Sequence, residues 1–285
     1  MKAILYTLAM ILLAQSTPAM LSQESRDTCT VTYIANEGFL IETKNQKVLI
    51  DALFGGIKGD WCEQPGDSLS SKIIHGVAPF DGIDLILVTH KHVDHFSEPM
   101  VIDFLKNNGK SVLICPEQVN EMLRNNADYS KVSGRIKSLH PGKDFDTSLS
   151  VRKMKVRVMR FDHGVYILTD SATGKPHNIH SGVENFCYLV ESDGFTVFHS
   201  GDCSTSDTVH FAGYGFAGKS IDIVLVDRTF LQREGMDLLS RAFRTKNMIF
   251  THVEPGRAEY YRTAIKGIPE MSIFAQSLEK KIVLK

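Results

Sequence analysis

The chain of 285 residues has few cysteines and no closely spaced pair of them. Its five cysteines (Cys29, Cys62, Cys115, Cys187 and Cys203) are scattered along the sequence, and no CxxC segment occurs. Zinc sites built from thiolates and small disulfide scaffolds both depend on close cysteine spacing. The sequence therefore excludes both classes of protein, and it leaves open which cysteines would pair if one disulfide forms.

An excess of charge of either sign is also absent. The chain contains 32 Lys and Arg residues against 33 Asp and Glu residues, which gives a formal net charge of −1. A protein that binds a polyanion through its general field usually carries a clear positive excess. We therefore expect no nucleic-acid partner.

No apolar run is long enough for a stable membrane span. Residues 3–14 form a mostly apolar run of 12, whereas a spanning helix needs about 20. Lys2 precedes this run and small or polar residues follow it through Ala19, which is the pattern of a secretory signal peptide. We predict that residues 1–19 are a signal peptide and that the protein is secreted or periplasmic. An uncleaved anchor is the alternative.

Apolar β-rich runs alternate with turn residues along the rest of the chain. Runs at 38–42 and 46–51 flank a turn, and residues 83–89 are nearly all apolar, as in a strand buried on both faces. Residues 55–80 between them are polar and rich in glycine, and we interpret them as a long surface loop. Further along, residues 151–161 alternate as one strand, and residues 184–202 predict a hairpin.

The two halves of the chain resemble each other. Each contains a hairpin that ends on an aspartate, Asp51 in the first half and Asp202 in the second. The segments IDLILVTH (83–90) and IDIVLVDR (221–228) also share most of their pattern. We therefore predict an α/β protein with a single domain at 20–285, folded as a four-layer αββα sandwich of two similar halves.

Three histidines and an aspartate follow one of these buried strands within six residues. In the segment THKHVDH, His90 and His92 stand two apart, so their side chains leave the same face of an extended strand end. Two imidazoles on one face can bind one metal ion. Asp94 and His95 follow after the chain turns and can reach a second ion. The sequence therefore predicts a metal site here.

Further ligands are expected where other strands end. Asp202 in FHSGD and His252 in IFTH both have this position. A third histidine is needed beside His90 and His92, and His163 fits because it closes the strand VRVMRF. His180 is the alternative, since it also precedes the hairpin that leads to Asp202.

The order of these motifs resembles that of the metallo-β-lactamase fold superfamily. THKHVDH is similar to its HxHxDH motif, HSGD to its GD motif, and Asp51 and His252 to its early aspartate and late histidine. The branch of ascorbate-6-phosphate lactonase-like and N-acyl-phosphatidylethanolamine phospholipase D-like hydrolases is the most similar. The resemblance implies two metal sites joined by Asp202, with Asp51 orienting a ligand histidine. The ligands of the first site would be His90, His92 and His163, and those of the second Asp94, His95 and His252.

The chemistry implied is a hydrolysis that needs two divalent metal ions. Zinc suits imidazole and carboxylate ligands best, and manganese or iron are alternatives. A hydroxide that bridges the ions would be the nucleophile, and Asp94 would shuttle a proton to the leaving group. A bridging carboxylate at Asp202 is usual in lactonases, thioesterases and phosphodiesterases of the superfamily and generally lacking in its true β-lactamases. The expected substrate is a small or lipid-like ester, lactone or phosphodiester; the alternatives are a non-catalytic metal- or ligand-binding protein and a β-lactamase.

Overall fold

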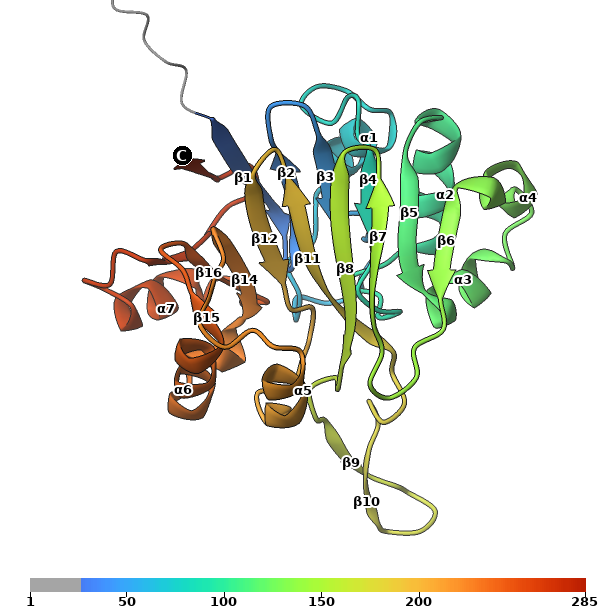
Figure 1. Ribbon diagram of the computed structural model, residues 1–285. Helices are drawn as coiled ribbons and strands as arrows, with labels where there is room; N and C mark the ends of the chain where they lie inside the picture. Colours follow the sequence, from blue (N-terminus) through green and yellow to red (C-terminus); the bar gives the residue numbers. More distant parts are fainter. Residues whose placement is uncertain (1–26) are drawn as a thin grey trace, which may run out of the picture.

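Two seven-stranded sheets pack face to face, with helices on both outer faces (Figure 1). The computed structural model describes residues 27–285, so the predicted signal peptide at 1–19 lies outside the described residues. The first sheet has the order β18 (Lys280–Leu284), β1 (Thr28–Ala35), β2 (Gly38–Glu42), β3 (Lys47–Ile50), β4 (Leu85–Leu87), β5 (Val112–Pro116) and β6 (Ile136–Leu139). The second has the order β17 (Met271–Ile273), β16 (Met248–Thr251), β14 (Ile223–Asp227), β12 (Phe195–His199), β11 (Asn185–Ser192), β8 (Met154–Phe161) and β7 (Asp146–Val151).

The helices lie in two groups, one on the outer face of each sheet (Figure 1). The first sheet is covered by α1 (Asp67–Ile74), α2 (Glu98–Asn107), α3 (Glu117–Leu123), α4 (Tyr129–Val132) and the short 3-10 helix η1 (Ser133–Arg135). The second is covered by α5 (Thr208–Gly213), α6 (Arg233–Ala242), α7 (Ala258–Ala264) and η2 (Arg228–Leu231). Two-stranded ribbons are formed by β9 (Ile167–Thr169) with β10 (Pro176–Asn178), and by β13 (Lys219–Ser220) with β15 (Phe243–Arg244).

Alternating side chains of the buried strands fill three apolar layers. In β4, Leu85 and Leu87 face the second sheet, whereas Ile86 faces the helices. In β11, Tyr188 packs between the sheets and Cys187 packs towards the helices of the second sheet. Such strands read as continuous apolar runs because both of their faces are buried. The predicted four-layer αββα sandwich is confirmed.

The two sheets repeat one order of strand pairing. In the first, β1, β2 and β3 pair antiparallel, and β3, β4, β5 and β6 pair parallel. In the second, β8, β11 and β12 pair antiparallel, and β12, β14, β16 and β17 pair parallel. The similarity between the two halves of the sequence thus corresponds to a repeated strand arrangement.

One local prediction is wrong, and another is confirmed only in part. The segment 55–80 is not one loop, because α1 (Asp67–Ile74) lies within it, with Ile73 fully buried. This helix is only about two turns long. Small polar residues and flanking glycines give it the composition of a loop, so the sequence did not predict it. The strand predicted at 151–161 is present as β8 but begins only at Met154, because the chain turns at Arg152, whose φ is 55°, between β7 and β8.

The sheets are joined by hydrogen bonds near the end of β4. The Tyr188 hydroxyl donates to the carbonyl oxygen of Val88 at 2.7 Å, and the Phe186 amide donates to the carbonyl oxygen of Thr89 at 2.9 Å. These bonds fix the position of the segment that starts at His90. All five cysteines are unpaired in the structure, and no helix of residues 27–285 is long and apolar enough to cross a bilayer.

Candidate metal centre

The predicted ligands meet where strands of both sheets end. His90 and His92 follow β4, and His163 follows β8. Asp202 follows β12, and His252 comes directly after β16. The structure brings all seven predicted ligands into two adjoining clusters, with Asp51 beneath them.

The first cluster contains His90, His92, His163 and Asp202. Nε2 of His90 lies 3.0 Å from Nδ1 of His92 and 3.3 Å from Nε2 of His163. Oδ2 of Asp202 lies 3.5 Å from Nε2 of His163. With metal–nitrogen bonds of about 2.0–2.1 Å, neighbouring ligands of a tetrahedral zinc ion are roughly 3.3 Å apart. The nitrogens of this cluster are therefore spaced as ligands of one ion.

The second cluster contains Asp94, His95 and His252. Oδ2 of Asp94 lies 3.1 Å from Nε2 of His252 and 3.5 Å from Nε2 of His95. Asp202 reaches this cluster too, since its Oδ1 lies 3.3 Å from Nε2 of His95 and its Oδ2 lies 3.5 Å from Nε2 of His252. Asp202 is thus placed between the two clusters, as a bridging ligand must be.

Hydrogen bonds behind the ligands orient the imidazole rings. Nδ1 of His95 donates to Oδ2 of Asp51 at 2.9 Å. The Thr89 hydroxyl donates to the same oxygen, and it can accept from Nδ1 of His90 at 3.0 Å. Nδ1 of His163 donates to the carbonyl oxygen of Gly164 at 2.9 Å. This assignment leaves the Nε2 lone pairs of these three histidines directed away from their supports, as metal binding requires.

The donor atoms themselves fit metal ions. Nε2 of His95 and Oδ1 of Asp202 are buried and lie 3.3 Å apart, but neither makes a hydrogen bond among residues 27–285. Buried polar atoms without partners are rare because they lose their hydration without compensation. A divalent cation is a partner that satisfies an imidazole nitrogen and a carboxylate oxygen together. The residues present therefore fit the two ions that the fold family implies.

The electrostatics of the two clusters differ. Burial lowers the pKa of His90 and of His163, and it lowers the pKa of His92 to about 4, so the first cluster offers neutral imidazoles. In the second, burial opposes the charged form of His252, but Asp202 and Asp94 outweigh it and raise its pKa to about 10. The carboxylates here need a positive charge close by, which a bound cation also supplies.

The alternative third histidine lies outside the first cluster. The ring of His180 is 4.3 Å from that of His163 and 4.8 Å from that of His92, between ring centroids. Nδ1 of His180 donates to the carbonyl oxygen of Gly164, the same oxygen that accepts from His163. Both rings are equally far from that of His92, but Nε2 of His163 also lies 3.3 Å from Nε2 of His90. The assignment of either residue to a metal ion stays a prediction.

Four buried polar residues around the centre were not predicted from the sequence. Asn36 donates to the main-chain and side-chain oxygens of Asp94, at 3.1 and 3.2 Å. Thr89 and Asp227 occupy matching positions at the ends of β4 and β14, and a search for polar residues at strand ends would have found them. Glu37 lies with Asn36 in the turn between β1 and β2, where polar residues are expected at the surface, so the sequence carried no signal for either.

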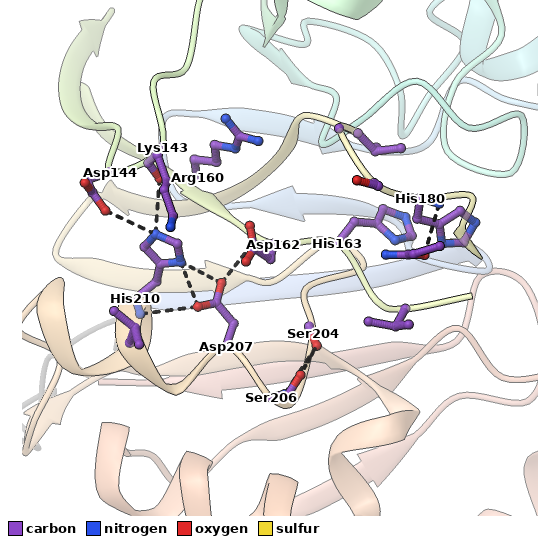
Figure 2. A pocket seen from close by; sticks show the side chains of 16 residues that line it. Lys143, Asp144, Arg160, Asp162, His163, His180, Ser204, Ser206, Asp207 and His210 are labelled. Carbon is purple, nitrogen blue, oxygen red and sulfur yellow. Dashed lines mark hydrogen bonds and ion pairs between the residues drawn. The ribbon is translucent and has the colours of Figure 1, made fainter. Parts of the chain in front are cut away.

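A cavity of about 530 Å³ opens at the two clusters. Its wall combines the ligands with apolar side chains, of which Trp61, Val93 and Ile179 are 52%, 57% and 41% exposed. His180 also lines a neighbouring polar pocket of about 460 Å³. Figure 2 shows His163 and His180 at one end of this pocket and His210 at the other, held by Asp207.

Replacement of Asp51 by asparagine is expected to weaken metal binding about 10–100-fold, which is typical when the support of a ligand histidine is removed. Asp51 accepts from His95 and the Thr89 hydroxyl through Oδ2 and from the Thr89 amide through Oδ1, and asparagine has only one oxygen to replace both. Its φ of 43° is a conformation that asparagine adopts readily, so the backbone should be preserved. Competition with a chromophoric chelator measures the effect. Asp103→Asn, at the surface, is the control. Unchanged metal affinity in Asp51→Asn would exclude a role of Asp51 in supporting the ligand histidine.

Comparison with known proteins places the chain in a family. The family model described as Beta-lactamase superfamily domain matches residues 46–268. A UPF0173 metal-dependent hydrolase from Polynucleobacter asymbioticus is 25% identical over 204 residues, which cover 70% of this chain and 63% of that protein. The chain thus aligns with less than two thirds of that relative's length.

Solved structures agree on the fold. The isothiocyanate hydrolase from Delia radicum gut bacteria is 16% identical, with a TM-score of 0.57 over 90% of this chain and 100% of its own. A metallo-β-lactamase fold protein from Bacillus subtilis is also 16% identical, with a TM-score of 0.54 over the same shares. At this identity the likeness shows the fold alone. The predicted relation to metal-dependent hydrolases is confirmed, whereas none of these matches identifies the lactonase-like or phospholipase-like branch. Because the family model covers more than half of its length, the chain belongs to the beta-lactamase superfamily domain family and has the metallo-β-lactamase fold.

Proposed function

We propose that the protein is an exported hydrolase that uses two divalent metal ions to cleave an ester, lactone or phosphodiester bond in a small molecule. The position of Asp202 is the observation that carries the proposal. Its two carboxylate oxygens lie within 3.5 Å of ligand atoms from both clusters, namely His163 in the first and His95 and His252 in the second. A pure binding site has no need of two adjoining ion sites that share one carboxylate.

The residues of the chain have distinct tasks in such a reaction. Ions bound here would supply Lewis acidity and a water molecule whose pKa falls from near 16 towards about 7. Asp94 lines the cavity, and Asn36 donates to its Oδ2 at 3.2 Å, which supports a role in accepting a proton and passing it to the leaving group. The neutral imidazoles of the first cluster are ready to bind without first losing a proton.

The cavity wall indicates the kind of substrate. Trp61, Val93 and Ile179 offer apolar surface next to the ligands, and Lys91 is the cation at the same wall. A cavity of about 530 Å³ is in the size range of small-molecule sites. We infer a small or lipid-like substrate with an apolar group beside the bond that is cleaved.

Chelation is expected to abolish activity, and two equivalents of zinc or manganese to restore it. The purified protein would be tested against paired sets of aryl esters, lactones and bis-aryl phosphodiesters before and after chelation, with metal content measured in the same samples. Activity that survives removal of the metal would refute the proposal. A protein that binds two ions per chain but cleaves no member of the panel would instead favour a non-catalytic metal-binding role.

A further inference from the structure

Glu37 is a buried glutamate outside the predicted ligand set, and one of its two carboxylate oxygens has no hydrogen-bond partner among the described residues. It lies in the turn between β1 and β2 and is fully buried. The Thr251 hydroxyl donates to its Oε1 at 2.7 Å, but Oε2 has no hydrogen-bond partner among the described residues. No lysine or arginine of residues 27–285 forms an ion pair with it. An uncompensated buried carboxylate is costly, so such a group usually has a charged partner or a metal ion.

The carboxyl group of Glu37 lies at the candidate metal centre. One of its oxygens, one ligand atom of His95 and one of Asp202 all lie within 4.8 Å of each other. Both of these residues also have a buried atom without a hydrogen-bond partner, Nε2 of His95 and Oδ1 of Asp202. Three buried, unsatisfied donor atoms for a metal thus belong to one small group of side chains.

The backbone of this turn is attached to the segments that carry the ligands. Nε2 of His199 donates to the carbonyl oxygen of Glu37 at 3.0 Å, and the Gly201 amide donates to the other nitrogen of that ring. The His252 amide donates to the carbonyl oxygen of Asn36 at 3.3 Å. A side chain at Gly38 would also collide with the Asp51 carbonyl oxygen, 2.8 Å from its Cβ, so this turn packs tightly against the centre. Glu37 is therefore held at a fixed place relative to Asp202 and His252.

We propose that Glu37 is an eighth ligand of the metal centre and supplies Oε2 to the second ion, together with Asp94, His95, His252 and Asp202. The proposal rests on the dinuclear centre inferred above. It gives each of the three unpartnered atoms a partner at once. It also explains why a carboxylate stands in a turn that is closed off from water.

The extra carboxylate makes the two sites chemically unequal. The first site has three imidazoles and one shared carboxylate, whereas the second has two imidazoles and three carboxylates. Imidazole-rich sites of four ligands suit zinc, while additional oxygen ligands and higher coordination suit manganese or iron. We therefore expect zinc in the first site and manganese(II) or iron(II) in the second.

Competitive metal loading tests this assignment. Metal-free wild type, Glu37→Gln and the control Glu117→Gln would each be incubated with equal amounts of zinc and manganese, desalted and analysed for metal content. Glu117 is also buried, but its carboxylate is paired with Arg124. The wild type and the control are expected to hold one zinc and one manganese ion per chain. Glu37→Gln is expected to keep the zinc and to bind manganese at least about tenfold more weakly.

Equal manganese binding by Glu37→Gln and the wild type would overturn the proposal, and so would an equal loss of both ions. If Glu37→Gln does not fold, anomalous diffraction from manganese-loaded wild-type crystals decides the question. Oε2 should then lie about 2.0–2.2 Å from the second ion, and a separation beyond hydrogen-bond range would exclude ligation. The two proposals can fail separately, because these measurements read metal binding whereas the chelation experiment reads hydrolysis.

Discussion

Asp202→Asn is expected to abolish hydrolysis and to leave the protein with fewer than two metal ions per chain. Oδ1 of Asp202 faces His95 at 3.3 Å, and Oδ2 faces His163 and His252 at 3.5 Å each. Asparagine keeps the size of the side chain but offers one oxygen in place of two and no negative charge. We expect kcat/KM to fall at least about 1,000-fold, which corresponds to roughly 4 kcal/mol of transition-state stabilisation.

The measurement for Asp202 combines metal content with turnover of the best substrate from the ester, lactone and phosphodiester panel. Asp103→Asn serves as the matched control, since Asp103 is a half-exposed surface residue near Lys106. The control should retain two ions and full turnover. If Asp202→Asn also retains both, with turnover unchanged, then the two clusters do not form a shared dinuclear centre.

His163→Ala is expected to lose one metal ion, whereas His180→Ala keeps both. The two rings are neighbours and donate to the same carbonyl oxygen, that of Gly164, so they form a closely matched pair. Nε2 of His163 lies 3.3 Å from Nε2 of His90, and His163 belongs to the cluster of His90, His92 and Asp202. We expect turnover to fall at least about 100-fold in His163→Ala, or roughly 3 kcal/mol, and to change little in the other variant.

Metal content measured by mass spectrometry after extensive dialysis separates the two histidines. A metal ion lost only from His180→Ala would show that the hairpin insertion, rather than the end of β8, supplies the third ligand. Loss from both variants would mean that the rings act together and that neither is the sole ligand. Far-ultraviolet circular dichroism controls for a general loss of folding.

Much of the fold could be predicted because each layer of the sandwich leaves its own pattern in the sequence. Strands such as β4 and β14 are apolar at nearly every position, since one face meets the other sheet and the opposite face meets helices. The predicted ligands His90, Asp202 and His252 could be identified in the sequence for a related reason. A polar residue directly after a fully buried strand interrupts the apolar run at a fixed place.

The features that the sequence did not predict lack such a contrast between apolar and polar residues. In α1, Leu69 and Ile73 are the side chains that pack against the apolar layer beside the first sheet, and small polar residues surround them. Asn36 and Glu37 have the composition of an exposed turn, but the strands that enter from both sheets bury them completely. Their burial depends on contacts with residues more than 50 positions away, such as Asp94 and Thr251. Local sequence patterns carry no information on contacts of that range.

Because the chain consists of two halves with the same strand order, the candidate metal centre has a structural role as well as a chemical one: it connects the two halves. His90 and His92 come from the first half of the chain, and the other two members of their cluster, His163 and Asp202, come from the second. The second cluster likewise joins a segment after β4 to His252 at the end of β16. Each ion would therefore be bound by residues from both halves and would hold the halves together. The halves are already joined by backbone hydrogen bonds, because β18 at the end of the chain returns to pair with β1. Loss of the ions would then weaken the contact between the two halves at the candidate metal centre.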